Sequence, residues 1–230
     1  MAKKKELAGV RIDDCSLEEA IYNIEEYLSN NCINIVEAIN MKTIVAAGED
    51  EDVRSCLEEM DMVVPADKEI LHEMGITSEE RLQEIQENQL FYETLERICQ
   101  GNYNLYLLTE TQEQKGRLAD YLSGTYDGKL IISGSYALED GKGDLEDVVN
   151  EVNAVAPHVI LATLSTPLQE RFVYEHRQML NAKLWFGIGT ESSIMAANSL
   201  GRLYKKFLVK QKMKRQIQSY EMSDKEETSE

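Results

Sequence analysis

The fold is decided by Pro157-His-Val-Ile-Leu-Ala-Thr-Leu-Ser-Thr-Pro-Leu-Gln-Glu170, by the segment 171–180 after it, and by Leu184-Trp-Phe-Gly-Ile-Gly189. The apolar half of the first segment predicts a buried strand, and its polar half predicts a turn that ends in Gln169-Glu170. A helix over 171–180 and a second apolar strand follow. This order places polar groups at the carboxyl ends of neighbouring strands, where open α/β sheets bind their ligands.

The same alternation of strands and helices extends upstream. Ser16-Leu-Glu-Glu19 is a capping-box signature, and apolar residues then recur at helical spacing. Alternating strands and helices indicate right-handed βαβ units, and therefore an α/β fold with a mostly parallel, Rossmann-like sheet that has helices on both faces. The expected helices are 17–29, 41–47, 51–60, 78–100 with an interruption near Asn88, 112–123 and 145–155, and the expected strands are 33–39, 62–64, 105–108 and 130–133.

Composition excludes several classes of protein. The chain has 230 residues and a formal net charge of −18, which opposes nonspecific binding to nucleic acid because phosphates require clustered Lys and Arg. No apolar run is long enough to span a membrane, and the basic start leads into no signal core, so we expect a cytoplasmic protein. The four cysteines have no metal or redox spacing, which predicts reduced thiols and no metal site.

The charge is unevenly distributed near the carboxyl terminus. Residues 202–215 contain several basic side chains and no acidic one, whereas 221–230 are acidic and poor in apolar residues. We therefore expect one α/β domain over 1–200, a basic helical appendage over 201–220 and a disordered acidic tail over 221–230. The appendage is either a solvated helix or an amphipathic surface for an anionic membrane.

Four segments together resemble one family. They are the opening 7–20, the turn Ala38-Ile39-Asn40, the turn Val64-Pro65-Ala66-Asp67 and the turn Pro167-Leu168-Gln169-Glu170. Over nearly the whole chain up to about Gly189, this series resembles the WecG/TagA/CpsF glycosyltransferases, which pass an N-acetylhexosamine from a UDP-sugar to a lipid-linked sugar. The turn Pro167-Leu168-Gln169-Glu170 keeps that family's Pro-x-Gln-Glu pattern.

The chain departs from the family pattern at four places. The family's Thr-x-Asn turn has lost its threonine at Ala38, and its Val-Pro-Asp-Gly turn has Ala66 where the proposed general base stands and Asp67 in place of the glycine. The Arg-x-x-Gly-x-Asp segment that helps to hold the donor corresponds to Glu84 through Gln89. The family's Gly-Gly turn has become Thr109-Glu110, which places a carboxylate where a diphosphate is expected.

The resemblance implies a transfer of an N-acetylhexosamine, with N-acetylmannosamine as the specific case, from a UDP-sugar to a polyprenyl-diphosphate-linked acceptor in cell-surface polysaccharide or teichoic acid synthesis. It implies no cofactor. The enzyme would work at the inner face of the cell membrane, as a peripheral protein. The implied roles are Asp67 as general base, Asn40 and Gln169 holding donor hydroxyls or uracil, Glu170 orienting the site, and Arg202, Lys205 and Lys206 taking the diphosphate.

Simpler interpretations stand beside these roles. Asn40 is well placed to cap the helix that follows it, and Gln169-Glu170 can begin a helix whose dipole favours a carboxylate in the first turn. The loss of the aligned aspartate, threonine and arginine also fits a non-catalytic relative that acts as a binding or regulatory module. The sugar, the acceptor and the oligomeric state, a homo-oligomer included, stay open.

Overall fold

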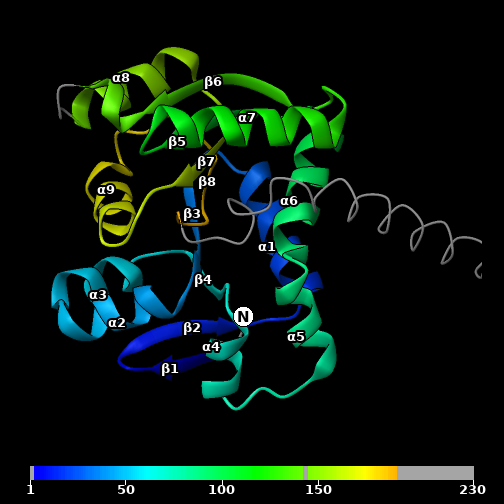
Figure 1. Cartoon of the computed structure of the whole chain (residues 1–230), viewed down its shortest axis with the longest axis vertical. Coiled ribbons are helices and arrows are strands. Elements are labelled where there is room, and N and C mark those ends of the chain that lie inside the picture. Colours follow the sequence, from blue (N-terminus) through cyan, green and yellow to red (C-terminus); the bar gives the residue numbers. More distant parts are fainter. Residues whose placement is uncertain (1–2, 142–144, 191–230) are drawn as a thin grey trace, which may run out of the picture.

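A computed structural model describes residues 3–141 and 145–190 of the chain (Figure 1). Its centre is a six-stranded sheet in the order β4-β3-β8-β7-β5-β6, and every neighbouring pair is parallel. The prediction of an α/β fold with a parallel sheet is confirmed. The strands are β3 (Asn34–Ile39), β4 (Met62–Pro65), β5 (Asn104–Thr109), β6 (Ile131–Ala137), β7 (Val159–Thr163) and β8 (Leu184–Gly187).

Strand β8 is the last strand of the described residues in sequence but lies in the middle of the sheet. Phe186 is in register with Val36 of β3 on one side and with Leu161 of β7 on the other. The pairing of β7 with β8 agrees with the neighbouring strands expected from the sequence. The contact with β3 brings together segments about 150 residues apart, and only the assembled sheet reveals it.

Helices cover both faces of the sheet, as expected (Figure 1). Buried side chains alternate along each strand: Ile35 packs into one apolar cluster, and Val36 packs into the other. The cluster with Ile35 includes α2 (Met41–Glu49), α3 (Glu51–Glu58), α4 (Lys68–Glu73), α8 (Leu145–Val155) and α9 (Leu168–His176), and the opposite cluster includes α1 (Leu17–Ser29), α6 (Gln89–Gln100) and α7 (Gln112–Tyr126).

An antiparallel hairpin of β1 (Lys3–Leu7) and β2 (Val10–Asp14) precedes the main sheet. Strand β2 lies in the opening segment 7–20 that carries the family resemblance, whereas β1 was not predicted because its lysine-rich sequence has no apolar alternation. The hairpin lies against β4 through buried Asp13, whose Oδ2 accepts a hydrogen bond of 2.9 Å from the amide of Val63. Strand β1 is held by its backbone pairing with β2 and by its lysines, since Lys4 pairs with Asp13 (3.5 Å) and Lys5 pairs with Asp14 (3.6 Å).

Most expected element boundaries agree with the structure to within a few residues. Asn88 adopts a left-handed conformation (φ 51°) and separates α5 (Glu79–Gln86) from α6, so the expected interruption is confirmed. Helix α9 begins at Leu168, three residues before the expected start, and ends at His176. Helix α2 continues through Gly48, where a break was expected, and β6 extends to Ala137.

None of the helices over residues 3–141 and 145–190 is both long and apolar enough to cross a membrane. The basic appendage and acidic tail expected over 201–230 lie outside the residues that the structure describes.

Candidate functional site

Asn40 and Asp67 lie together at the carboxyl ends of β3 and β4. Asn40 caps α2, since its Oδ1 accepts hydrogen bonds from the amides of Lys42 (2.8 Å) and Thr43 (3.1 Å). Asp67 precedes α4 but does not cap it with its side chain. Its Oδ2 accepts a 3.0 Å hydrogen bond from the amide of Met41 at the start of α2. Both side chains are half-buried, so each has an accessible part at this edge of the sheet.

Gln169 lies in the first turn of α9 and is buried, with 2% of its surface exposed. Its Oε1 accepts a hydrogen bond from the amide of Leu164 (3.0 Å), and its Nε2 donates to Oε2 of Glu37 (2.7 Å). Glu37 also accepts a 2.7 Å hydrogen bond from the indole of Trp185 through Oε1. This Trp185–Glu37–Gln169 network ties β8, β3 and the turn before α9 together.

Glu170 is the second buried carboxylate of this region. Its Oε1 accepts a hydrogen bond from the hydroxyl of Thr166 (2.8 Å), which in turn lies 3.1 Å from the hydroxyl of Thr43 on α2. Its Oε2 is buried without a hydrogen-bond partner among the described residues. Burial raises the pKa of Glu170. Glu170 therefore contributes to the packing between α9 and α2.

Glu37 has the most perturbed carboxyl group of the network. Burial, and secondarily the nearby Glu170 carboxylate, raise the pKa of Glu37 to about 8. Hydrogen bonds from Trp185 and Gln169 act in the opposite direction by stabilising the ionised form. Sequence reasoning missed both Glu37 and Trp185 as members of the site. The available signal was a single carboxylate in the otherwise apolar segment 35–39.

Glu110 follows β5 at the same edge of the sheet. Its Oε1 accepts hydrogen bonds from the amide of Ser165 (2.7 Å) and from the hydroxyl of Ser165. A backbone amide and a hydroxyl are also the donors that commonly hold a phosphate. The carboxylate of Glu110 therefore occupies the two hydrogen-bond donors of Ser165, which follows β7.

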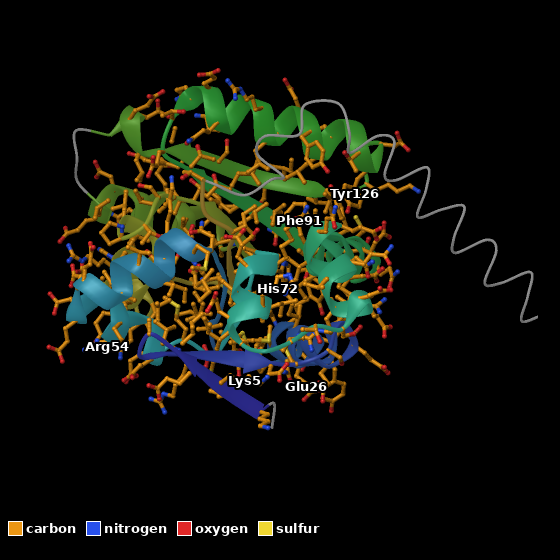
Figure 2. The ribbon with its side chains drawn as sticks, turned by 60° about the horizontal axis from the view of Figure 1, so that its bottom comes forward. Lys5, Glu26, Arg54, His72, Phe91 and Tyr126 are labelled. Atoms are coloured by element: carbon orange, nitrogen blue, oxygen red, sulfur yellow. The ribbon has the colours of Figure 1, made fainter. Side chains whose placement is uncertain are left out.

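An apolar pocket lies at this edge on the α1 and α6 side of the sheet. Its wall includes Ala66 at the end of β4, while Asp67 does not line it. Phe91, which Figure 2 labels on α6, lines the pocket together with Phe186, and the centroids of the two rings are 6.4 Å apart. The lining residues come from the start of α1, the ends of three strands and the junction of α5 and α6: Cys15, Ser16, Leu17, Ala20, Ala38, Val64, Pro65, Ala66, Arg81, Glu84, Ile85, Asn88, Gln89, Leu90, Phe91, Phe186 and Ile188.

The structure thus brings four of the expected site residues to one edge of the sheet: Asn40, Asp67, Gln169 and Glu170. The other three, Arg202, Lys205 and Lys206, lie outside the described residues. Over 3–141 and 145–190, no group of three or more His, Cys, Asp and Glu side chains is arranged to hold a metal ion.

A known protein family matches most of the chain. The profile of the glycosyl transferase WecG/TagA/CpsF family matches residues 5–198, which is most of the chain. None of the curated proteins matches the chain significantly.

Proposed function

Since the chain belongs to the WecG/TagA/CpsF family of glycosyl transferases, we propose that it moves an N-acetylhexosamine from a UDP-sugar to a polyprenyl-diphosphate-linked acceptor. N-Acetylmannosamine is the sugar that the resemblance favours. The observation that carries the proposal is the family match together with the apolar pocket beside Asn40 and Asp67 at the carboxyl ends of parallel strands. That edge is where open α/β sheets bind substrates.

Asp67 is the proposed general base. It removes the proton of the acceptor hydroxyl while that oxygen attacks the anomeric carbon of the sugar and the bond to UDP breaks. A base must come within about 2.6–3.2 Å of the hydroxyl oxygen that loses the proton. Asp67 is half-buried, and the neighbouring residue Ala66 lines the pocket. The amide of Met41 donates its hydrogen bond to Oδ2 of Asp67. Oδ1 of Asp67 is therefore the oxygen assigned to the hydroxyl of the acceptor substrate.

The other assigned residues contribute in different ways. Asn40 uses its Oδ1 to cap α2, so its Nδ2 is the group assigned to a donor hydroxyl or to uracil. Gln169 has both ends of its amide engaged within the protein, and we therefore assign its effect on donor binding to the position of the turn 164–167. Glu170 acts on the same turn through Thr166.

Asp67→Asn provides the direct test. It keeps the size of the side chain and should lower turnover of UDP-N-acetylhexosamine by roughly 10²- to 10⁴-fold, with donor affinity nearly unchanged. Turnover is measured by chromatographic separation of UDP from the UDP-sugar, with a short-chain lipid-diphosphate sugar as acceptor. Full activity of Asp67→Asn would show that another group accepts the proton.

A second candidate function is supported by the lining of the pocket. Ala66, which takes the register position of the family's aspartate, lines the pocket together with Glu84, which takes the position of the family's arginine. Glu110 takes a position of the family's Gly-Gly turn and lies against Ser165. These features favour a non-catalytic relative that uses the fold as a binding module. Calorimetric titration separates the candidates: a binding module gives heat with UDP-sugars without turnover, whereas absence of heat at millimolar UDP-sugar would contradict the transferase proposal.

A further inference from the structure

Helix α5 forms one wall of the apolar pocket. Four of the lining residues come from α5 and its junction with α6: Arg81, Glu84, Ile85 and Asn88. The side chains of Arg81 and Glu84 are largely enclosed. At the edge of the molecule, α5 stands between the chain that leads from α4 and helix α6 (Figure 1). The helix therefore separates this part of the pocket from solvent.

Helix α5 is attached more weakly than the helices on either side of it. Every residue of α5 lies in the described part of the chain, and none of its side chains is buried. By contrast, α4 buries Ile70 and Leu71, and the buried side chains of α6 include Phe91, Leu95 and Ile98. Segments with few buried apolar contacts open locally at a lower free energy than the rest of a fold. In this region, α5 is therefore the element that separates most readily.

The two ends of α5 provide places where the chain can bend. Gly75, between α4 and α5, is exposed and has φ 72°, and Asn88, between α5 and α6, has φ 51°. Glycine adopts positive and negative φ with similar ease, and asparagine is one of the few other residues that tolerate the left-handed region. Residues of this kind, at the ends of an element, absorb the dihedral changes of a hinge. Rotation at these two residues would move α5 and leave the anchored helices in place.

An ion pair joins α5 to the hairpin of β1 and β2. Nη1 of Arg81 lies 3.3 Å from Oδ1 of Asp14 at the end of β2. The other ion pair of Arg81, from its Nε to Oε2 of Glu84 (3.4 Å), stays within α5. Strong charge-assisted hydrogen bonds are about 2.7–2.9 Å long, so the contact with Asp14 is weak enough to break and form again. Asp14 also has Lys5 at 3.6 Å and keeps a cation when Arg81 leaves.

We propose that α5 is a lid over the apolar pocket and that it opens by rotation at Gly75 and Asn88. The ion pair between Arg81 and Asp14 holds the lid closed. Opening exposes the pocket wall, which includes Cys15 just before α1, and admits a ligand whose apolar part fits that wall. The lid is a property of the fold and does not rest on the proposed glycosyl transfer.

The thiol of Cys15 reports on opening, because it lines the pocket and is only 5% exposed. Burial, and secondarily Asp13, raise the pKa of Cys15 to about 11, so the closed form reacts slowly with N-ethylmaleimide. Cys56 is the internal reference, since it is buried on α3, which covers the opposite face of the sheet. Peptide mass spectrometry of the full chain after timed labelling measures both rates. Cys15 should be labelled at least about tenfold faster than Cys56.

Arg81→Gln removes the ion pair and should speed the labelling of Cys15 roughly two- to fivefold, with Cys56 unchanged. The charge of Arg81 lowers the pKa of Cys15, so its loss alone would slow the labelling, and a faster rate therefore reports opening. Arg11→Gln is the matched control. It breaks a pair with Glu58 (3.6 Å) on the same hairpin, neither residue lines the pocket, and both labelling rates should stay as in the wild type.

Hydrogen exchange followed by mass spectrometry gives a second measurement. Amides of α5 should exchange at least about tenfold faster than those of α6, and Arg81→Gln should speed exchange in α5 and not in α6. Equal labelling rates of Cys15 and Cys56 in the wild-type protein would refute the lid. If Arg81→Gln is folded by circular dichroism and leaves either the labelling of Cys15 or the exchange of α5 unchanged, the ion pair does not hold the lid. Neither result would affect the proposed glycosyl transfer.

Discussion

Gly187 allows the buried carboxylate of Glu37 to occupy its place beside β8. A Cβ atom at residue 187 would lie 2.2 Å from Oε2 of Glu37, 2.4 Å from Oε1 and 2.5 Å from Cδ. These distances are far inside van der Waals contact. The carboxylate has no free direction of movement, because Trp185 and Gln169 hold its two oxygens. Gly187→Ala should therefore destabilise the protein strongly.

The size of the effect follows from the two ways in which the clash can be relieved. Overpacking of a rigid interior costs about 1–3 kcal/mol. Rotation of Glu37 away from the new methyl group would leave two buried donors without partners, at about 1–3 kcal/mol each. The less costly route limits the loss, so we expect a decrease of about 1–3 kcal/mol in the free energy of unfolding. For a chain of this size, the melting temperature would fall by roughly 2–12 °C.

Urea unfolding followed by far-UV circular dichroism measures the loss, and the fluorescence of Trp185, the single tryptophan, reports on the network itself. Gly48→Ala in α2 is the matched control. No atom lies within 4 Å of the added Cβ, and alanine should be neutral or stabilise the helix by about 0.5–1 kcal/mol. In a Glu37→Ala background, Gly187→Ala should cost little. A loss from Gly187→Ala below about 1 kcal/mol, or an undiminished loss without Glu37, would refute the clash.

Three further outcomes are expected. Because burial and Glu170 raise the pKa of Glu37 from 4.5 to about 8, the folded protein binds the extra proton between these values. The free energy of unfolding should thus fall by up to ~1.4 kcal/mol per pH unit as pH rises through this window, and Glu37→Gln should flatten the urea-midpoint profile. Glu37→Gln and Gln169→Glu should each lower the free energy of unfolding by about 1–3 kcal/mol or more, because two donors or two acceptors then face each other. The double variant should recover most of this loss, and additive losses would contradict the hydrogen-bond assignment. If residues 202–215 form a basic membrane-binding surface, sedimentation with anionic liposomes should be salt-sensitive and should disappear on truncation after Gly201, whereas equal binding by the truncated protein would exclude that role.

The sequence by itself determined the elements and the class of the fold. Local rules are sufficient for these: the capping box of Ser16 and Glu19 forms as expected, the left-handed Asn88 divides α5 from α6, and apolar runs form the buried strands. The motif that ends in Gln169-Glu170 likewise predicted the edge of the sheet at which these two side chains lie. These features depend on residues within a few positions of one another.

The tertiary structure decided which side chains share an environment. Insertion of β8 between β3 and β7 brings Glu37 to Trp185 and Gln169, which are 148 and 132 residues away in sequence. The same assembly directs the Asp67 carboxylate to the amide of Met41 and leaves Ala66 on the pocket wall. Sequence periodicity specifies the face of each strand but not the order of strands. The raised pKa of Glu37 and the pairing of Arg81 with Asp14 depend on tertiary contacts and burial, and so only the folded chain reveals them.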